Sequence, residues 1–165
     1  MAAPFRLAPA TRDDAALVLA LIKGLAEYER LGHEVVATED DIRRTLFGDR
    51  PAAEVVIAYA DDEPAGFALF FQSYSTFLGR PGLYLEDLFV VEAWRGRGLG
   101  RLLLTHLAQL AVERGWGRVE WSVLTWNEPA IGFYRRIGAQ LLEEWRTCRL
   151  TGQALHDLAA GAGSR

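Results

Sequence analysis

A glycine- and arginine-rich loop between two apolar segments constrains the fold of this chain more than any other feature. The loop reads RGRGLGR over residues 95–101, follows an apolar segment at 83–91, and opens directly into leucines at helical spacing over 99–110. Glycines let the backbone turn sharply and approach a ligand closely. Exposed N–H groups at the start of a helix attract anions. A strand, this loop and a helix in that order predict an α/β fold with a pyrophosphate cradle.

Turn residues and apolar spacing divide the rest of the chain into predicted elements. Leucines at four-residue spacing predict a helix that runs to about Tyr28. Two further helices are expected at residues 39–47 and 128–137, because each follows a capping residue, Thr38 or Asn127. Strands are predicted at residues 5–8, 53–60, 65–74, 83–91, 119–124 and 145–150.

Composition excludes several classes of function. A chain of 165 residues suits one domain, and its net charge of −4 argues against nucleic acid or an anionic membrane as a partner. The single cysteine, Cys148, cannot form an internal disulfide, and the three histidines lack the spacing of metal ligands, so no metal is expected. With no apolar run long enough to span a bilayer and no signal peptide, we expect a cytoplasmic protein.

The loop pattern discriminates among nucleotide-binding motifs. The dinucleotide fingerprint requires a third glycine where this chain has Arg101, and no G-K-[ST] motif is present. The pattern found is Arg-x-x-Gly-x-Gly at Arg95, Gly98 and Gly100. It resembles the coenzyme A signature of the GNAT acetyltransferase superfamily.

Three further segments extend the resemblance over about residues 5–151. The run WNEPAIGFYRRIGA at 126–139 resembles the segment in which this superfamily places a tyrosine beside the coenzyme A sulfur. LAEYERL at 25–31 and YLEDLFV at 84–90 are similar to the diamine and thialysine N-acetyltransferase branch. The loop at 74–80 and Thr125 lack the acids of polyamine enzymes, which favours a shorter amine.

The resemblance implies a fold and two substrates. It implies a mixed, mostly antiparallel sheet of six to seven strands with helices on both faces, and with the strands of the two motif blocks parallel. It implies one domain over residues 1–165, with a tail at 152–165, and a homodimer. Acetyl-CoA would be the co-substrate, and the partner a small-molecule amine such as thialysine, a diamine or a polyamine.

Acetyl transfer to an amine also predicts catalytic residues. An alkylamine with a pKa near ~10.4 must lose a proton before it attacks, and the resemblance assigns the base to Glu86. It assigns the acid that protonates the departing thiolate to Tyr134. It further implies that the strand at 83–91 carries a bulge and separates from its neighbour, which exposes the N–H of Leu88 to the oxyanion. Asp87 should lie on the opposite face from Glu86 and be structural.

The remaining predicted contacts fall into two sets. The expected cofactor-binding residues are Leu88, Phe89, Val90, Arg95, Gly96, Arg97, Gly98, Leu99, Gly100, Arg101, Asn127, Ala130 and Tyr134. The expected amine-binding residues are Tyr28, Glu29, Glu86, Trp121 and Ser122.

Each role has a plain structural alternative. The same sequence also fits structural roles, in which Glu86 is a salt-bridged carboxylate, Tyr134 is an ordinary helix tyrosine and Trp121 is a core residue. Two other functions also stay open at this point. One is acetylation of a protein lysine or N-terminus, and the other is a coenzyme A-binding module without catalysis.

Overall fold

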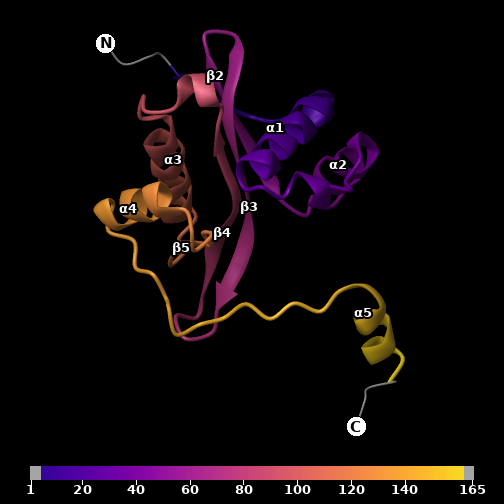
Figure 1. The fold of residues 1–165 in the computed structure, drawn as a ribbon. Helices are drawn as coiled ribbons and strands as arrows, with labels where there is room; N and C mark the ends of the chain where they lie inside the picture. The colour runs from indigo at the N-terminus through magenta and orange to yellow at the C-terminus, as the bar shows by residue number, and fades with distance from the viewer. Residues whose placement is uncertain (1–4, 162–165) are drawn as a thin grey trace. The chain divides into compact units, whose positions relative to one another are not determined.

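The computed structural model describes residues 5–161, in two compact units that meet in sequence at Leu124 and Thr125. The first unit contains a sheet with the order β1-β2-β3-β4-β5, in which β2 to β5 are labelled in Figure 1. Neighbouring strands are antiparallel, except that β4 and β5 are parallel, as predicted. The strands are β1 (Phe5–Pro9), β2 (Glu54–Ala60), β3 (Glu63–Ser75), β4 (Arg80–Val90) and β5 (Val119–Trp121).

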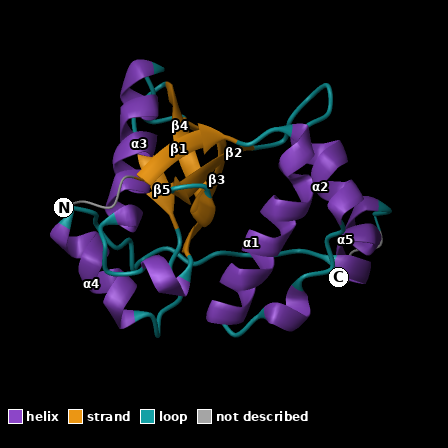
Figure 2. Cartoon of the chain, turned by 90° about the horizontal axis from the view of Figure 1, so that it is seen from above, coloured by secondary structure: helices purple, strands orange, loops and turns teal. Residues whose placement is uncertain are grey.

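Helices cover both faces of this sheet. Helices α1 (Ala15–Tyr28) and α2 (Glu39–Leu46) lie on one face, and α3 (Leu99–Glu113) lies on the other (Figures 1 and 2). Apolar residues of α1 and α2 form one buried cluster with Ile57, Phe67 and Leu69 of the sheet. Because successive strand residues point to opposite faces, their neighbours supply the second apolar layer, which packs against α3. The predicted layer arrangement is confirmed.

Local signals set the ends of these helices. At the start of α2, the Asp41 N–H donates to the Thr38 hydroxyl (3.1 Å), and the Thr38 N–H donates to the Asp41 carboxylate (2.9 Å). This reciprocal pair satisfies main-chain donors that a helix start otherwise leaves unpaired. Helix α3 ends before Gly115, whose φ of 69° is left-handed and suits a residue without a Cβ.

The second unit contains two helices, α4 (Glu128–Arg136) and α5 (Gly152–Ala159). Asn127 caps α4 as predicted, since its side-chain oxygen accepts a hydrogen bond from the Ala130 N–H (3.4 Å). Helix α5 lies in the segment that the sequence suggested to be a tail. Across residues 5–161, none of the helices has both the length and the apolar content needed to cross a bilayer.

The strand count is lower than the six to seven expected. Residues 145–150, predicted as the last strand, have no regular structure, and the described chain has five strands. Strand β5 also ends at Trp121 and not at Leu124. A strand exists only where a neighbour completes its hydrogen bonds, so an apolar or alternating pattern alone does not make one.

Candidate active site

Strands β4 and β5 separate in the middle of β4. They pair from Leu83 opposite Val119 to Leu85 opposite Trp121, and in the described chain the later residues of β4 pair with β3 alone. The sheet therefore opens along the second half of β4, as the family resemblance implied.

The open edge presents main-chain groups of β4. The Val91 N–H donates to the Ala65 carbonyl on the β3 side (2.9 Å). Main-chain groups of successive residues in a strand point to alternate sides. Val90 and Leu88 therefore direct their N–H and C=O groups toward the open edge, whereas Phe89 directs its groups toward β3. The main-chain groups of Val90 and Leu88 are therefore suited to bind an amide-containing arm.

A β-bulge lies at Glu86, where the strands begin to separate. Leu69 faces Asp87 and Phe70 faces Leu85, so Glu86 has no opposite residue on β3. An extra residue reverses the alternation of the strand, and Asp87 consequently shares the face of Leu69, which packs with α1 and α2. The bulge implied by the resemblance is confirmed.

The charges of Glu86 and Glu29 act on the Asp87 carboxyl beside the bulge. Burial, and then the charges of Glu86 and Glu29, raise the pKa of Asp87 to about 6. Burial also raises the pKa of Glu29. A concentration of negative charge in a partly buried place favours a cationic ligand. Alternation along the strand gave Asp87 a structural role and gave no sign that the charges of Glu86 and Glu29 act on it.

The end of α1 holds the predicted pair Tyr28 and Glu29. Tyr28 is the last helical residue and Glu29 is the C-cap. Arg30 follows in a left-handed conformation (φ 62°), and the N–H groups of Arg30 and Leu31 donate to carbonyls of the last turn at 3.0 and 2.7 Å. These two hydrogen bonds end the helix in a defined conformation and so fix the backbone that carries Tyr28 and Glu29.

The glycine loop has the backbone of an anion cradle. Gly96 and Gly98 have φ of 72° and 83°, and Gly98 is the N-cap of α3, so no side chain caps the first turn. Leu99 is fully buried and anchors the start of the helix in the core. No side chain caps the N–H groups of this turn, which suits the turn to bind a phosphate.

Two arginines of the loop lie on aromatic rings. The Arg97 guanidinium carbon is 4.8 Å from the centroid of the Trp94 ring. The Arg95 guanidinium carbon is 4.7 Å from the centroid of the Tyr28 ring, and Arg95 Nε donates to the Val90 carbonyl (3.0 Å). The loop and the end of α1 are thus in direct contact.

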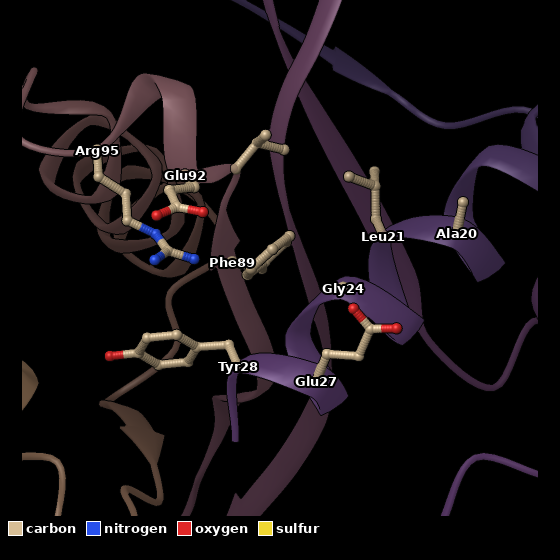
Figure 3. A pocket seen from close by; sticks show the side chains of 9 residues that line it. Ala20, Leu21, Gly24, Glu27, Tyr28, Phe89, Glu92 and Arg95 are labelled. Carbon is tan, nitrogen blue, oxygen red and sulfur yellow. The ribbon is translucent and has the colours of Figure 1, made fainter. Parts of the chain in front are cut away.

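A hollow of about 490 Å³ lies between α1 and the end of β4 (Figure 3). Its apolar floor includes Phe89 and Gly24, where an added Cβ would lie 2.9 Å from the Phe89 ring. Glycine therefore permits the close packing of α1 on β4. The lining residues are Ala20, Leu21, Gly24, Glu27, Tyr28, Phe89, Val91, Glu92 and Arg95.

The end of β5 carries two more predicted residues. Trp121 is the last residue of β5 and lies opposite Leu85, next to the bulge. The Ser122 hydroxyl is 3.0 Å from the Tyr84 hydroxyl, and the Tyr84 ring stacks on Phe71. Both predicted residues therefore lie where the two strands part.

The second unit carries Asn127, Ala130 and Tyr134. Asn127 is buried and caps α4, whose first turn contains Ala130. The Tyr134 ring lies 5.6 Å from the Phe133 ring, measured between centroids. Among residues 5–161, no three histidine, cysteine or acidic side chains converge in a way that could hold a metal ion.

Comparison with known proteins places the chain among acetyltransferases. The sequence model of the acetyltransferase (GNAT) family matches residues 21–139. L-ornithine N5-acetyltransferase NATA1 of Arabidopsis thaliana is 37% identical, with 91% of this chain and 86% of that protein covered. Thialysine N-epsilon-acetyltransferase of Caenorhabditis elegans is 37% identical, with 94% and 97% covered. An integron cassette protein from the V. cholerae mobile metagenome has a similar structure, with a TM-score of 0.81, 27% identity, and 96% and 98% covered.

Proposed function

Because the chain belongs to the acetyltransferase (GNAT) family and is an acetyl-CoA-dependent N-acetyltransferase, we propose that its acceptor is the primary amine of a small molecule. The acceptor is of the thialysine or ornithine type, which the names of the relatives give, or is a related diamine. The observation that carries this proposal is the cluster of Glu29, Glu86 and Asp87 beside the opening between β4 and β5. Such a cluster attracts an ammonium group and lies where an acyl group could reach it.

The residues of the first unit fit acetyl-CoA. The C=O group of Leu88 and the N–H and C=O groups of Val90, on either side of Phe89, suit the amides of the pantetheine arm, and the loop from Arg95 to Arg101 suits the pyrophosphate. In the second unit, Asn127, Ala130 and Tyr134 complete the proposed cofactor contacts. Acetyl-CoA supplies the activated acetyl group as a thioester.

Glu86 is the proposed base. It accepts the proton that the ammonium group must lose, directly or through a water molecule. Tyr28 and Glu29 hold the cationic part of the acceptor, and Trp121 and Ser122 line its path. The neutral amine then attacks the acetyl carbonyl, and a new C–N bond forms.

Two further groups complete the proposed reaction. The Leu88 N–H donates to the carbonyl oxygen as negative charge develops on it. Tyr134 donates its phenolic proton to the sulfur as the C–S bond breaks, since a phenol is protonated at neutral pH and a thiolate is a sufficient base. Products are the N-acetyl amine and coenzyme A.

The proposal includes the organisation of the protein. The two compact units form one acetyltransferase domain, a view supported by the family match, which runs across their boundary from residue 21 to 139. The active form is a homodimer, and the expected location is the cytoplasm.

Release of free thiol from acetyl-CoA tests this function. The purified protein is assayed with thialysine, L-ornithine, lysine, putrescine, spermidine and a lysine peptide. We expect turnover with at least one short amine and little with the peptide. Preference for the peptide would favour a protein acetyltransferase, and binding of acetyl-CoA without any turnover would favour a non-catalytic coenzyme A-binding module.

A variant pair tests the assignment of the base. Glu86→Gln should lower kcat/KM by about 10²-fold or more at pH 7, and less at high pH, where the free amine is already neutral. Glu63→Gln, an exposed carboxylate at the start of β3, is the matched control and should behave as wild type. An unchanged pH–rate profile in Glu86→Gln would remove Glu86 from this role.

A further inference from the structure

Arg95 links the two halves of the proposed site. Its Nε donates to the Val90 carbonyl (3.0 Å), on the open edge of β4. Its guanidinium carbon lies 4.7 Å from the centroid of the Tyr28 ring, at the end of α1, and 5.8 Å from that of Phe89. Figure 3 shows the Arg95 side chain extending toward the Tyr28 ring at one side of the hollow. One side chain thus contacts both the open edge of β4, where acetyl-CoA is proposed to bind, and the end of α1, where the amine is proposed to bind.

This geometry gives Arg95 a task beyond the phosphate contact that the sequence suggested. An arginine that only binds phosphate has no need of a main-chain bond to β4 or of a ring on α1. Here both contacts are present within the chain itself. A guanidinium over an aromatic ring is attracted by the electron density of the ring face, and the planar group is held in a defined orientation.

We propose that Arg95 is a positioning residue that couples binding of acetyl-CoA to binding of the amine, through its contact with Tyr28. The inference rests on the proposed function, in which Tyr28 and Glu29 hold the acceptor. A ligand bound along the open edge of β4 restricts the remaining motion of the end of that strand and of the loop. Through Arg95, it also restricts the motion of the Tyr28 ring.

The Val90 carbonyl is the group that both Arg95 and the pantetheine arm contact in this proposal. A carbonyl oxygen has two lone pairs, so it can accept from Arg95 and from an amide of the pantetheine arm at once. Any motion of Arg95 and Tyr28 that binding still restricts is restricted when the first substrate binds, so the second substrate binds with a smaller loss of entropy and therefore more tightly. Such coupling is reciprocal, so the amine must raise the affinity for coenzyme A by the same factor.

Calorimetric titration of the full chain measures this factor. The probes are coenzyme A, which cannot transfer an acetyl group, and the amine with the highest turnover in the thiol-release panel. We expect saturating coenzyme A to tighten amine binding by about 5-fold or more in the wild type. In Arg95→Met the factor should fall to about 1, although the protein still binds both ligands.

Further variants separate coupling from a general loss of structure. Tyr28→Leu should abolish the same factor, and the double variant should be no worse than Tyr28→Leu alone. Arg95→Lys keeps the positive charge and should restore part of the factor. Arg97→Met is the matched control from the same loop, since Arg97 lies on Trp94 and not on Tyr28. It should weaken binding of coenzyme A but leave the factor intact.

The outcomes distinguish this inference from the function on which it rests. If no amine in the panel is acetylated or bound, the proposed function fails and the coupling fails with it. If the wild type acetylates an amine and Arg95→Met keeps the full coupling factor, only the inference is overturned. Additive effects of Arg95→Met and Tyr28→Leu would overturn it equally.

Discussion

The Asp87 carboxyl is held in the protonated form to a higher pH than a free aspartic acid. Burial is the main cause, and the negative charges of Glu86 and Glu29 add to it, so the pKa rises from 3.8 to about 6. Because folding favours the protonated form, the stabilisation is complete below about pH 4 and is lost as the pH rises through 6. A cluster that attracts a cationic substrate therefore destabilises the fold at neutral pH.

Asp87→Asn tests this electrostatic cost. The difference between the two pKa values corresponds to at most about 3 kcal/mol, at about 1.4 kcal/mol for each tenfold change. We expect the variant to raise the free energy of unfolding by about 1–3 kcal/mol at pH 8 and to change it little at pH 4. Urea denaturation at both pH values measures the difference, with Asp62→Asn, in an exposed turn, as the control. Equal stabilisation at both pH values would contradict the prediction.

Tyr134→Phe tests the proposed acid. The substitution removes one hydroxyl and retains the ring, so the contact with Phe133 is kept. We expect kcat to fall by about 10²-fold, in line with the loss of a general acid, while the Kd for acetyl-CoA changes less than about threefold. Steady-state kinetics and calorimetric titration provide the two values. Turnover equal to that of the wild type would exclude Tyr134 from the mechanism.

At the scale of elements, sequence patterns predicted what depends on near neighbours in the chain. The strand, glycine loop and helix from Leu83 to Glu113, the cap at Thr38 and the end of α3 before Gly115 all arise from local chemistry. The motif at 95–101 then identified the family.

What the sequence patterns missed depends on partners across the sheet. The bulge at Glu86 is a mismatch between β3 and β4, and residues 145–150 lack a strand to pair with. Neither property is contained in one segment, so alternation along the strand could not anticipate the bulge or the face that Asp87 shares with Leu69. Without the family resemblance, the separation of β4 from β5 could not have been anticipated from spacing either.

The glycine loop makes a prediction at this scale. Gly98 has a φ of 83°, and apart from its chain neighbours no atom lies within 4 Å of the position that a Cβ would take, so Gly98→Ala acts through the backbone alone. A left-handed alanine costs about 1–2 kcal/mol. We expect a comparable loss in the free energy of unfolding and weaker binding of acetyl-CoA, measured by urea denaturation and calorimetry.

Gly100→Ala is the matched control for the stability effect. Gly100 lies in the first turn of α3 with ordinary helical backbone, and its nearest potential contact is a methyl carbon of Val90 at 4.0 Å. Alanine should be neutral there or stabilising by up to about 1 kcal/mol. If both variants lost the same stability, the left-handed conformation at Gly98 would not be the cause.

At the scale of the molecule, the chain leaves large apolar side chains uncovered between residues 142 and 158. Leu142 and Trp145 are 51% and 74% exposed in a segment without regular structure, and α5 exposes Leu155 and Leu158. Soluble proteins rarely leave such a series of apolar residues in water. In the proposed homodimer, a second copy of the chain covers these apolar residues.

The dimer is tested by molecular mass in solution. Light scattering coupled to gel filtration should give twice the 18.3 kDa mass of one chain at micromolar concentration. Replacing Trp145 and Leu155 together by serine should shift the protein toward 18.3 kDa, because the apolar contact would lose its driving force. Phe77→Ser is the matched control, since Phe77 is fully exposed at the turn after β3 and lies outside this segment. A monomeric wild type, or equal dissociation by Phe77→Ser, would show that residues 142–158 do not form the interface.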